Sequence, residues 1–547
     1  MRKKLFLWVV IILSIIIGIY FLIRFIGKSS PYTSRHLINF GPYSLLKVDL
    51  KPDLSSLTDS QKVMVKYLIL ASQYADSMFL YENAGMYFSL LDSLKGIQKL
   101  RFELNFGPWD RYNSNKSFIS NVIDKPKGAY FYPIGMTEFD FRRFRDKCKY
   151  SHFTFIRKTL NEKYTCIPYH VKFKDWIDTV NYFITKAASY SQDSMFAKYL
   201  IQLTKDLQTD NYYKSDSIWL KIHPKVDFVF GPVLIDDDKL FNLKAEHQAY
   251  VLIEDKVWTQ KMKNFSQWLV YLQKALPVPE QYRRENPGSM SEIRVYNAIY
   301  YGGSAHAGPP VISITLPLRI YKNIPGFRNM QFKNIIEAKY KALIKPLISI
   351  VYVEAQRKYV SQQAFFVNTL LYEMASSLGI RYTIRHRRPV SEALGKNYTC
   401  IEYMKNSLLT LYLAEKLHSV GQIPGDLKNY YYTYILDLLR QIRWGVDNNF
   451  AKANLIIFNY LFRNDALDFL PTGQIILHYQ TMEQDIQDMI RKVIEIEGNG
   501  DRVAAEQFIN HYKNIPPELK RLLDLIKKNK VPRGIFLNQG LDVLNLK

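Results

Sequence analysis

The chain has 547 residues, of which 48% are hydrophobic, 14% aromatic and 23% charged, and its formal net charge is +24 at pH 7. This hydrophobic content excludes an intrinsically disordered chain, and the length allows a large core. Three cysteines exclude a disulfide-dense scaffold. The sequence contains no C-x-x-C pair of the kind that would indicate a structural zinc site. The basic charge favours anionic surfaces, although lysines and arginines spread along the whole chain also fit an ordinary solvated surface.

The N-terminus gives the clearest local signal. Residues 5–23 are uncharged and almost wholly apolar, and they follow Arg2, Lys3 and Lys4. A helix of this length rises about 28 Å, close to the hydrocarbon thickness of a bilayer. No small-residue cleavage site follows the run. We therefore predict a cytoplasmic tail at 1–4 and an uncleaved transmembrane anchor at 5–26, with the body of the protein outside the cytoplasm.

The remaining patterns predict a stalk, helices and a few strands, without an internal repeat or a second linker. Residues 27–50 are predicted to form a stalk that ends in an entry strand, and 51–547 one interlocked folded unit. Apolar residues at helical spacing, or alternating as in strands, mark the elements. Helices are expected at 54–100, 176–207, 332–378, 403–417 and from 430 onward, and strands at 249–254 and 311–320.

Short motifs follow one another over some 400 residues in an order that resembles the dipeptidyl peptidase III family of zinc metallopeptidases, especially its shorter bacterial branch. The segments that carry the resemblance are Gly107-Pro108-Trp109-Asp110-Arg111, Lys127-Gly128-Ala129-Tyr130-Phe131-Tyr132-Pro133, Tyr213-Lys214-Ser215-Asp216-Ser217-Ile218-Trp219, Phe230-Gly231-Pro232, Arg443-Trp444-Gly445 and Gly498-Asn499-Gly500-Asp501. The resemblance implies a helix-dominated α+β fold. It further implies a two-lobed ectodomain with a central cleft, behind the N-terminal anchor.

The family's zinc ligands are replaced in this chain. In an H-E-x-x-H helix two histidines at i and i+4 bind zinc, and the glutamate between them is the general base. The resemblance places Tyr372 and Ser376 at the two histidine positions and Glu373 at the base. The third ligand, a glutamate in the family, corresponds to Tyr403, and a histidine that assists catalysis corresponds to Phe450.

The substrate cleft differs as well. The resemblance places Glu402, Asn406, Leu234 and Pro317 in the cleft, with Asn406 where the family has a further acid. Leu234 stands where a family glutamate receives the free N-terminus of the peptide. Because pairing an ammonium group needs a carboxylate, Leu234 cannot replace that glutamate.

These substitutions predict that zinc is lost and that no other cofactor replaces it. Tyrosine and serine remain protonated at neutral pH and bind zinc poorly. Without a Lewis acid, a water beside Glu373 keeps the high pKa of bulk water instead of a pKa of about 7. His386 is the nearest histidine in sequence, in a loop with Arg385, Arg387 and Arg388, and a single loop histidine is more often solvated than metal-bound.

Three functions remain open at this stage. The leading hypothesis is a pseudopeptidase in a bacterial inner membrane, with a periplasmic ectodomain that binds a peptide or protein. The second is an active hydrolase with altered chemistry that uses Glu373. The third is a basic module for anionic polymers, for which the topology argues against nucleic acid. Cys148 and Cys166 either pair in an oxidising compartment or remain free thiols, and the oligomeric state and the ligand stay open.

Overall fold

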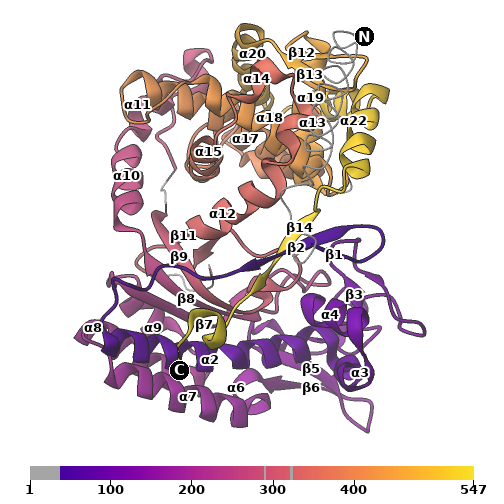
Figure 1. Cartoon of the computed structure of the whole chain (residues 1–547). Coiled ribbons are helices and arrows are strands. Elements are labelled where there is room, and N and C mark those ends of the chain that lie inside the picture. Colours follow the sequence, from indigo (N-terminus) through magenta and orange to yellow (C-terminus); the bar gives the residue numbers. More distant parts are fainter. Residues whose placement is uncertain (1–36, 289–290, 319, 321–323, 447, 547) are drawn as a thin grey trace, which may run out of the picture.

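The chain forms two stacked halves, each with its own hydrophobic core (Figure 1). A computed structural model describes residues 37–288, 291–318, 320, 324–446 and 448–546. In the view of Figure 1 the lower half contains a sheet flanked by helices, and the upper half is almost entirely helical. The predicted helix-rich α+β class is confirmed.

The lower half is organised by a five-stranded sheet in the order β10-β11-β9-β8-β7. The pair of β9 and β11 is parallel and the other neighbours are antiparallel. The strands are β7 (Val226–Leu234), β8 (Glu246–Glu254), β9 (Glu292–Gly303), β10 (Ser313–Leu316) and β11 (Arg328–Phe332). The other elements of this half are α2 (Asp59–Ala84), α3 (Leu90–Ser93), α4 (Gly96–Asn105), β3 (Trp109–Asp110), β4 (Lys116–Ser117), α5 (Glu138–Arg143), β5 (Thr154–Lys158), β6 (Tyr164–Pro168), α6 (Tyr169–Lys172), α7 (Lys174–Ser189), α8 (Ser194–Leu207) and α9 (Tyr213–Trp219).

Helix α2 is the long support of this sheet. A capping box starts it, because the Thr58 side chain accepts from the Gln61 backbone while the Gln61 side chain accepts from the Thr58 N–H. Its apolar face packs against β7, β8 and β9. Gly302 of β9 permits this approach, because a Cβ there would lie 2.5 Å from the carbonyl oxygen of Ser72 in α2.

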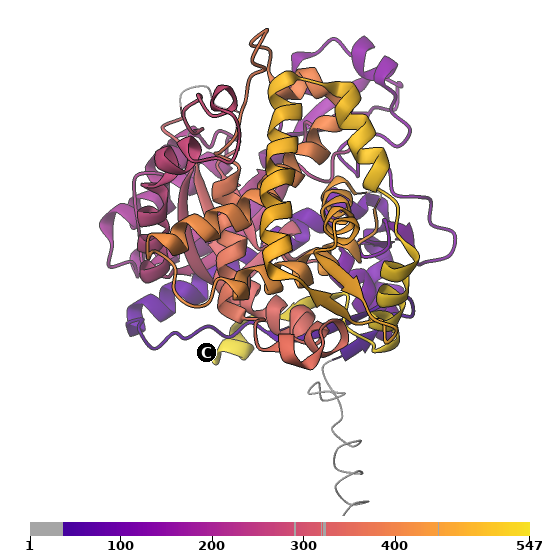
Figure 2. The same ribbon diagram turned by 90° about the horizontal axis from the view of Figure 1, so that it is seen from above.

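The upper half is a helical assembly crossed by the long helix α20, which Figure 2 shows from above. A small hairpin of β12 (Leu467–Phe469) and β13 (Ile475–Leu477) packs beside α19. The helices are α10 (Lys256–Ser266), α11 (Leu269–Lys274), α12 (Lys333–Lys339), α13 (Leu347–Val351), α14 (Glu354–Arg357), α15 (Gln362–Ala375), α16 (Val390–Leu394), α17 (Tyr398–Ser419), α18 (Lys428–Ile442), α19 (Asn449–Arg463), α20 (Tyr479–Asn499), α21 (Arg502–Tyr512) and α22 (Pro517–Lys528).

The chain crosses between the halves several times. Helices α10 and α11 contribute Met262 and Leu269 to the upper core, although they lie between two strands of the lower sheet in sequence. After α22 the chain returns through β14 (Gly534–Asn538) to α23 (Leu541–Leu544), whose Leu544 belongs to the lower core. The two halves are therefore interleaved in sequence.

The segment expected to act as a stalk is partly folded. Strands β1 (Leu37–Asn39) and β2 (Ser44–Asp49) form a three-stranded sheet with the C-terminal strand β14. The predicted tail and anchor at 1–4 and 5–26 lie outside the described residues. Within the described residues, no helix is long and apolar enough to span a membrane.

Several other expectations changed in detail. The helical pattern at 54–100 is interrupted at Gly85, whose φ of +52° ends α2. The pattern at 176–207 is two helices, separated where Asp193 caps α8. The strand expected at 311–320 is limited to β10, and three short strands interrupt the helices predicted after residue 430.

Candidate functional site

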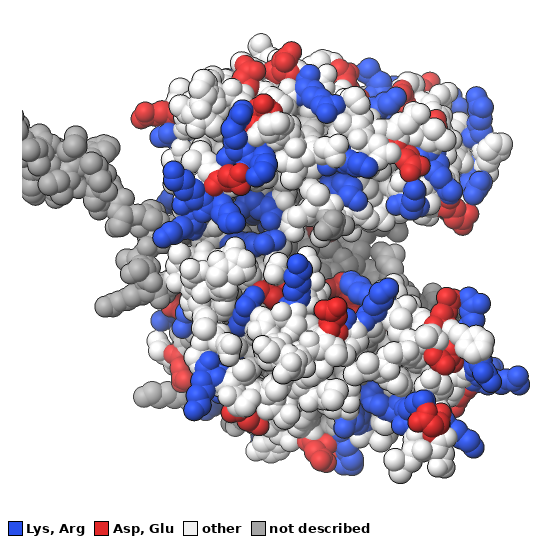
Figure 3. All heavy atoms as spheres, turned by 90° about the vertical axis from the view of Figure 1, so that its right-hand side faces the viewer, with Lys and Arg blue, Asp and Glu red and all other residues white. Residues whose placement is uncertain are grey.

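A cavity of about 680 Å³ opens between the two halves. Figure 3 shows the surface hollowed between them on one side of the molecule. Both halves contribute side chains, and the cavity lies beside the edge strand β10 and the C-terminal end of α15. The lining residues are His152, Ile235, Gly288, Ser291, Ile293, Thr315, Pro317, Leu318, Ile320, Asn329, Glu373, Ser376, Ser377 and Arg381.

Glu373 projects from α15 toward the lower sheet. Ser361 caps the start of this helix by accepting from the Ala364 backbone. The Glu373 carboxylate accepts from Ser313 Oγ at 3.0 Å and from Asn329 Nδ2 at 3.1 Å. Burial raises the pKa of Glu373 above its ordinary value, and the hydrogen bonds from neutral donors oppose that rise. Glu373 thereby joins an upper helix to two lower strands.

Three of the four positions that correspond to zinc ligands and to the helper histidine gather into an aromatic cluster. The Phe450 ring contacts Tyr372 at a centroid distance of 5.8 Å and Tyr403 at 5.3 Å, both edge-to-face. These three rings come from α19, α15 and α17, and α17 packs against both other helices. Ser376 is exposed at the end of α15, where its hydroxyl donates to the Glu373 carbonyl oxygen at 2.7 Å.

This cluster does not fit a zinc ion. Burial first, and then the Glu373 carboxylate, raise the pKa of Tyr372 well above its ordinary value, so its phenol keeps its proton. The Phe450 ring offers no lone pair, and it packs edge-to-face against both tyrosines. In the part of the chain that the structure describes, no group of three histidine, cysteine or acidic side chains could hold a metal.

Glu402 and Asn406 are directed into the upper half and are not among the cavity's lining residues. Lys405 Nζ donates to both oxygens of Glu402, at 2.9 and 2.8 Å, and lies 3.9 Å from Glu497. Glu497 is fully buried, and this burial is the main cause that raises its pKa well above the ordinary value. Asn406 is buried as well, so Lys405, Glu497 and Asn406 belong to the interior of the upper half and not to the lining of the cavity.

Of the remaining expected cleft residues, Pro317 lines the cavity and Leu234 does not. Leu234 ends β7 beside a bulge, and its neighbour Ile235 is the lining residue. Sequence reasoning missed Ser313 and Asn329, the two partners of Glu373. Ser313 and Thr315 alternate along β10, a signal that could have placed them on one face, whereas nothing local marks Asn329.

Cys148 and Cys166 form a disulfide with a Cα–Cα distance of 6.1 Å. The bond links the segment after α5 to strand β6 of the lower half. This settles the alternative that the sequence left open. Cys400 is a buried free thiol.

Comparison with known proteins agrees with this fold. The model of the family described as "Peptidase family M49" matches residues 149–376 of this chain. A dipeptidyl peptidase III structure from Caldithrix abyssi superposes with a TM-score of 0.87 at 28% identity, over 92% of this chain and 98% of that one. This protein is a homologue of dipeptidyl peptidase III. A second dipeptidyl peptidase III structure, from Corallococcus sp. strain EGB, gives a TM-score of 0.77 at 26% identity, over 91% of this chain and 96% of the other.

A curated relative has a different name. The Arabidopsis thaliana protein named Nudix hydrolase 3 is 24% identical over 558 residues, which is 89% of this chain and 72% of that protein. The dipeptidyl peptidase III homologue described here therefore shares its fold with solved peptidases. Its resemblance to this plant protein extends over most of its length.

Proposed function

We propose that this dipeptidyl peptidase III homologue binds a peptide segment in its cleft without cleaving it. The observation that carries the proposal is the packing of Phe450 against Tyr372 and Tyr403, where the family has a catalytic helper and zinc ligands. Without a metal to activate water, hydrolysis loses its nucleophile at neutral pH. The cavity of about 680 Å³ is nevertheless retained.

The cavity offers a backbone-binding edge. Strand β10 is at one end of the sheet order and pairs with β11 on one side only, as far as the described residues show. Thr315 and Pro317 of this region line the cavity. An extended peptide can add to such an edge through main-chain hydrogen bonds, with affinity that depends little on its N-terminus.

The cavity lacks the acid that would select a free peptide N-terminus. Glu373 is the one acidic side chain among the described lining residues, and Ser313 and Asn329 already donate to it. Leu234 is not a lining residue. We therefore expect internal peptide segments and N-terminal segments to bind with similar affinity.

The second candidate is a hydrolase that uses Glu373 without zinc. Its support is the raised pKa of this half-buried carboxyl, a property common to catalytic acids and bases. The hydrogen bonds that Ser313 and Asn329 donate from the sheet argue against this role, because they hold the Glu373 carboxylate as an acceptor.

We further propose a location at the periplasmic face of a bacterial inner membrane, tethered through residues 5–26. The disulfide between Cys148 and Cys166 supports an oxidising compartment. The anchor prediction rests on the apolar run and its preceding positive charges.

The test combines metal analysis with substrate assays on the purified full chain. We expect less than about 0.1 zinc per chain, no turnover of dipeptidyl-arylamides or of a random peptide library, and measurable peptide binding. The double variant Tyr372→His with Ser376→His should still not bind zinc tightly, because Tyr403 remains. Turnover that survives purification and disappears in Glu373→Ala would favour the hydrolase instead.

A further inference from the structure

An arginine-rich loop follows the end of α15 at the cavity. Residues 381–389 contain Arg381, Arg385, Arg387 and Arg388 with His386, and no acidic residue. All four arginines are exposed. The proposed function leaves this loop unexplained.

The loop has a defined backbone. Thr383 is buried, and its N–H donates to the Arg388 carbonyl oxygen at 2.9 Å while its Oγ1 accepts from the Arg388 N–H at 3.1 Å. The N–H of Ile384 donates to the Gly498 carbonyl oxygen at 2.7 Å, which fixes the loop to the end of α20. Exposed arginines on such a fixed backbone lose less conformational entropy on binding than arginines on a loose segment.

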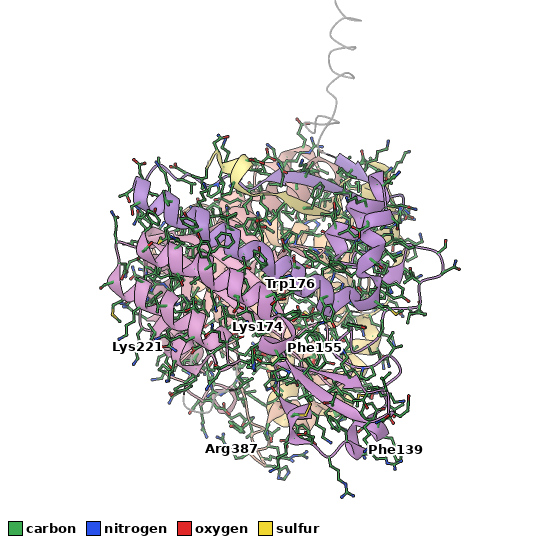
Figure 4. The ribbon with its side chains drawn as sticks, turned by 90° about the horizontal axis from the view of Figure 1, so that it is seen from below. Phe139, Phe155, Lys174, Trp176, Lys221 and Arg387 are labelled. Atoms are coloured by element: carbon green, nitrogen blue, oxygen red, sulfur yellow. A yellow bond between two sulfur atoms is a disulfide. The ribbon has the colours of Figure 1, made fainter. Side chains whose placement is uncertain are left out.

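The loop begins at the rim of the cavity. Arg381 is one of the residues that line it, together with Ser376 and Ser377 of the preceding turn. In Figure 2 the loop is the orange hairpin that projects beyond the outline of the molecule. Figure 4 places Arg387 at the same edge as Phe139 of α5 in the lower half, which is the side on which Figure 3 shows the hollow.

The positive charge of the loop is only partly compensated. Glu285 lies 3.6 Å from Arg381 and 3.4 Å from Arg387. Arg385 and Arg388 form no ion pair with any described residue. The loop thus presents at least two exposed guanidinium groups whose charge no ion pair compensates.

We propose that this loop recognises carboxylate side chains of an acidic polypeptide segment whose backbone lies in the cavity. The inference rests on the proposed function and adds the class of ligand. Guanidinium groups bind carboxylates through paired hydrogen bonds, which are stronger than neutral ones. The neutral polar lining beside β10, which includes Ser291, Thr315 and Asn329, suits a peptide backbone better than a highly charged polymer.

Fluorescence anisotropy with the full chain in zwitterionic detergent tests this inference. The probes are three labelled peptides of equal length: one rich in glutamate, its glutamine counterpart and its lysine counterpart. We expect the glutamate peptide to bind about tenfold more tightly than the glutamine peptide at about 0.05 M salt, and the difference to shrink at about 0.5 M. The lysine peptide should bind most weakly.

Matched variants separate the loop from the overall charge. Arg385→Gln with Arg388→Gln should weaken binding of the glutamate peptide about fivefold or more and leave the glutamine peptide unchanged. The control Lys527→Gln with Lys528→Gln removes the same charge from exposed positions on α22, and should change binding less than about twofold.

Each remaining result has one meaning. Equal binding of the glutamate and glutamine peptides would overturn this inference and leave peptide binding intact. Absence of binding by all three peptides would overturn the proposed function itself. Polyphosphate that binds through Arg385 and Arg388 more tightly than the glutamate peptide would overturn the inference about the loop, because the loop would then select a polyanion and not a polypeptide.

Discussion

At the scale of single residues, the aromatic cluster replaces coordination bonds with ring packing. Phe450 lies edge-to-face against Tyr372 and Tyr403 and so joins three helices of the upper half. Each such pair contributes about 0.5–1.5 kcal/mol beyond the burial of its area. The cluster therefore stabilises the same helices that a metal would link, by a mechanism that needs no ion.

The Phe450→Ala variant measures this contribution. We expect it to lower the free energy of unfolding by about 2–3 kcal/mol, less than for a fully buried phenylalanine, because the ring is half-buried. The control Tyr403→Phe keeps the ring contact and should change stability by less than about 1 kcal/mol. Urea unfolding of both variants provides the comparison, and equal stabilities would mean that the ring contacts do not hold the helices together.

The sequence located this cluster only in part. Tyr372, Ser376, Tyr403 and Phe450 were identified through their correspondence to family positions, and the structure brings three of them into contact. The partners of Glu373 could not be predicted, because Ser313 and Asn329 are far from it in sequence and carry no motif. Their proximity depends on how the two halves stack.

At the scale of elements, the contact between α2 and β9 fixes the lower half. The sheet can lie close to the helix only where β9 has no side chain. At this contact a Cβ on Gly302 would lie 2.5 Å from the Ser72 carbonyl oxygen of α2, and within the sheet a Cβ on Gly303 would lie 2.1 Å from the His247 carbonyl oxygen of β8. Both obstacles are backbone atoms, which cannot move away as a flexible side chain would.

A pair of glycine variants separates the steric effect from the backbone effect. Gly303 and Gly421 have similar positive φ values, +64° and +71°, but no heavy atom lies within 4 Å of a Cβ built at Gly421. Gly421→Ala should cost about 1–2 kcal/mol for the left-handed conformation alone. Gly303→Ala should cost about 2 kcal/mol more or prevent folding. Thermal unfolding that gives equal losses would contradict the proposed tight contact.

At the scale of the whole molecule, one sheet joins the first strands of the described chain to its last strand. Strand β1 pairs with β2, and β2 pairs with β14, so the segment after the predicted anchor is fixed to the C-terminal strand. The cavity receives side chains from both halves, and Glu373 forms hydrogen bonds across their boundary. A ligand in the cleft would therefore contact both halves at once.

The anchor at 5–26 gives the prediction that belongs to the whole molecule. We expect the full chain to stay with membranes after an alkaline carbonate wash. The variant Ile15→Lys with Ile16→Lys should be released, because each lysine at the centre of a span costs about 2.5–3.5 kcal/mol. The control Ile15→Leu with Ile16→Leu should remain bound. Release of the unaltered chain by the wash would contradict the anchor.

The sequence by itself determined the helix-rich class, the family resemblance and the loss of the zinc-binding side chains. These properties reside in residue identity and in local periodicity, which can be read without coordinates. The tertiary structure decided the pairing of Cys148 with Cys166, the hydrogen bonds of Glu373 and the ion pair of Glu402 with Lys405. It also placed Arg381, the first residue of the arginine loop, in the lining of the cavity. Each of these depends on contacts between segments distant in sequence, which form only when the two halves pack together.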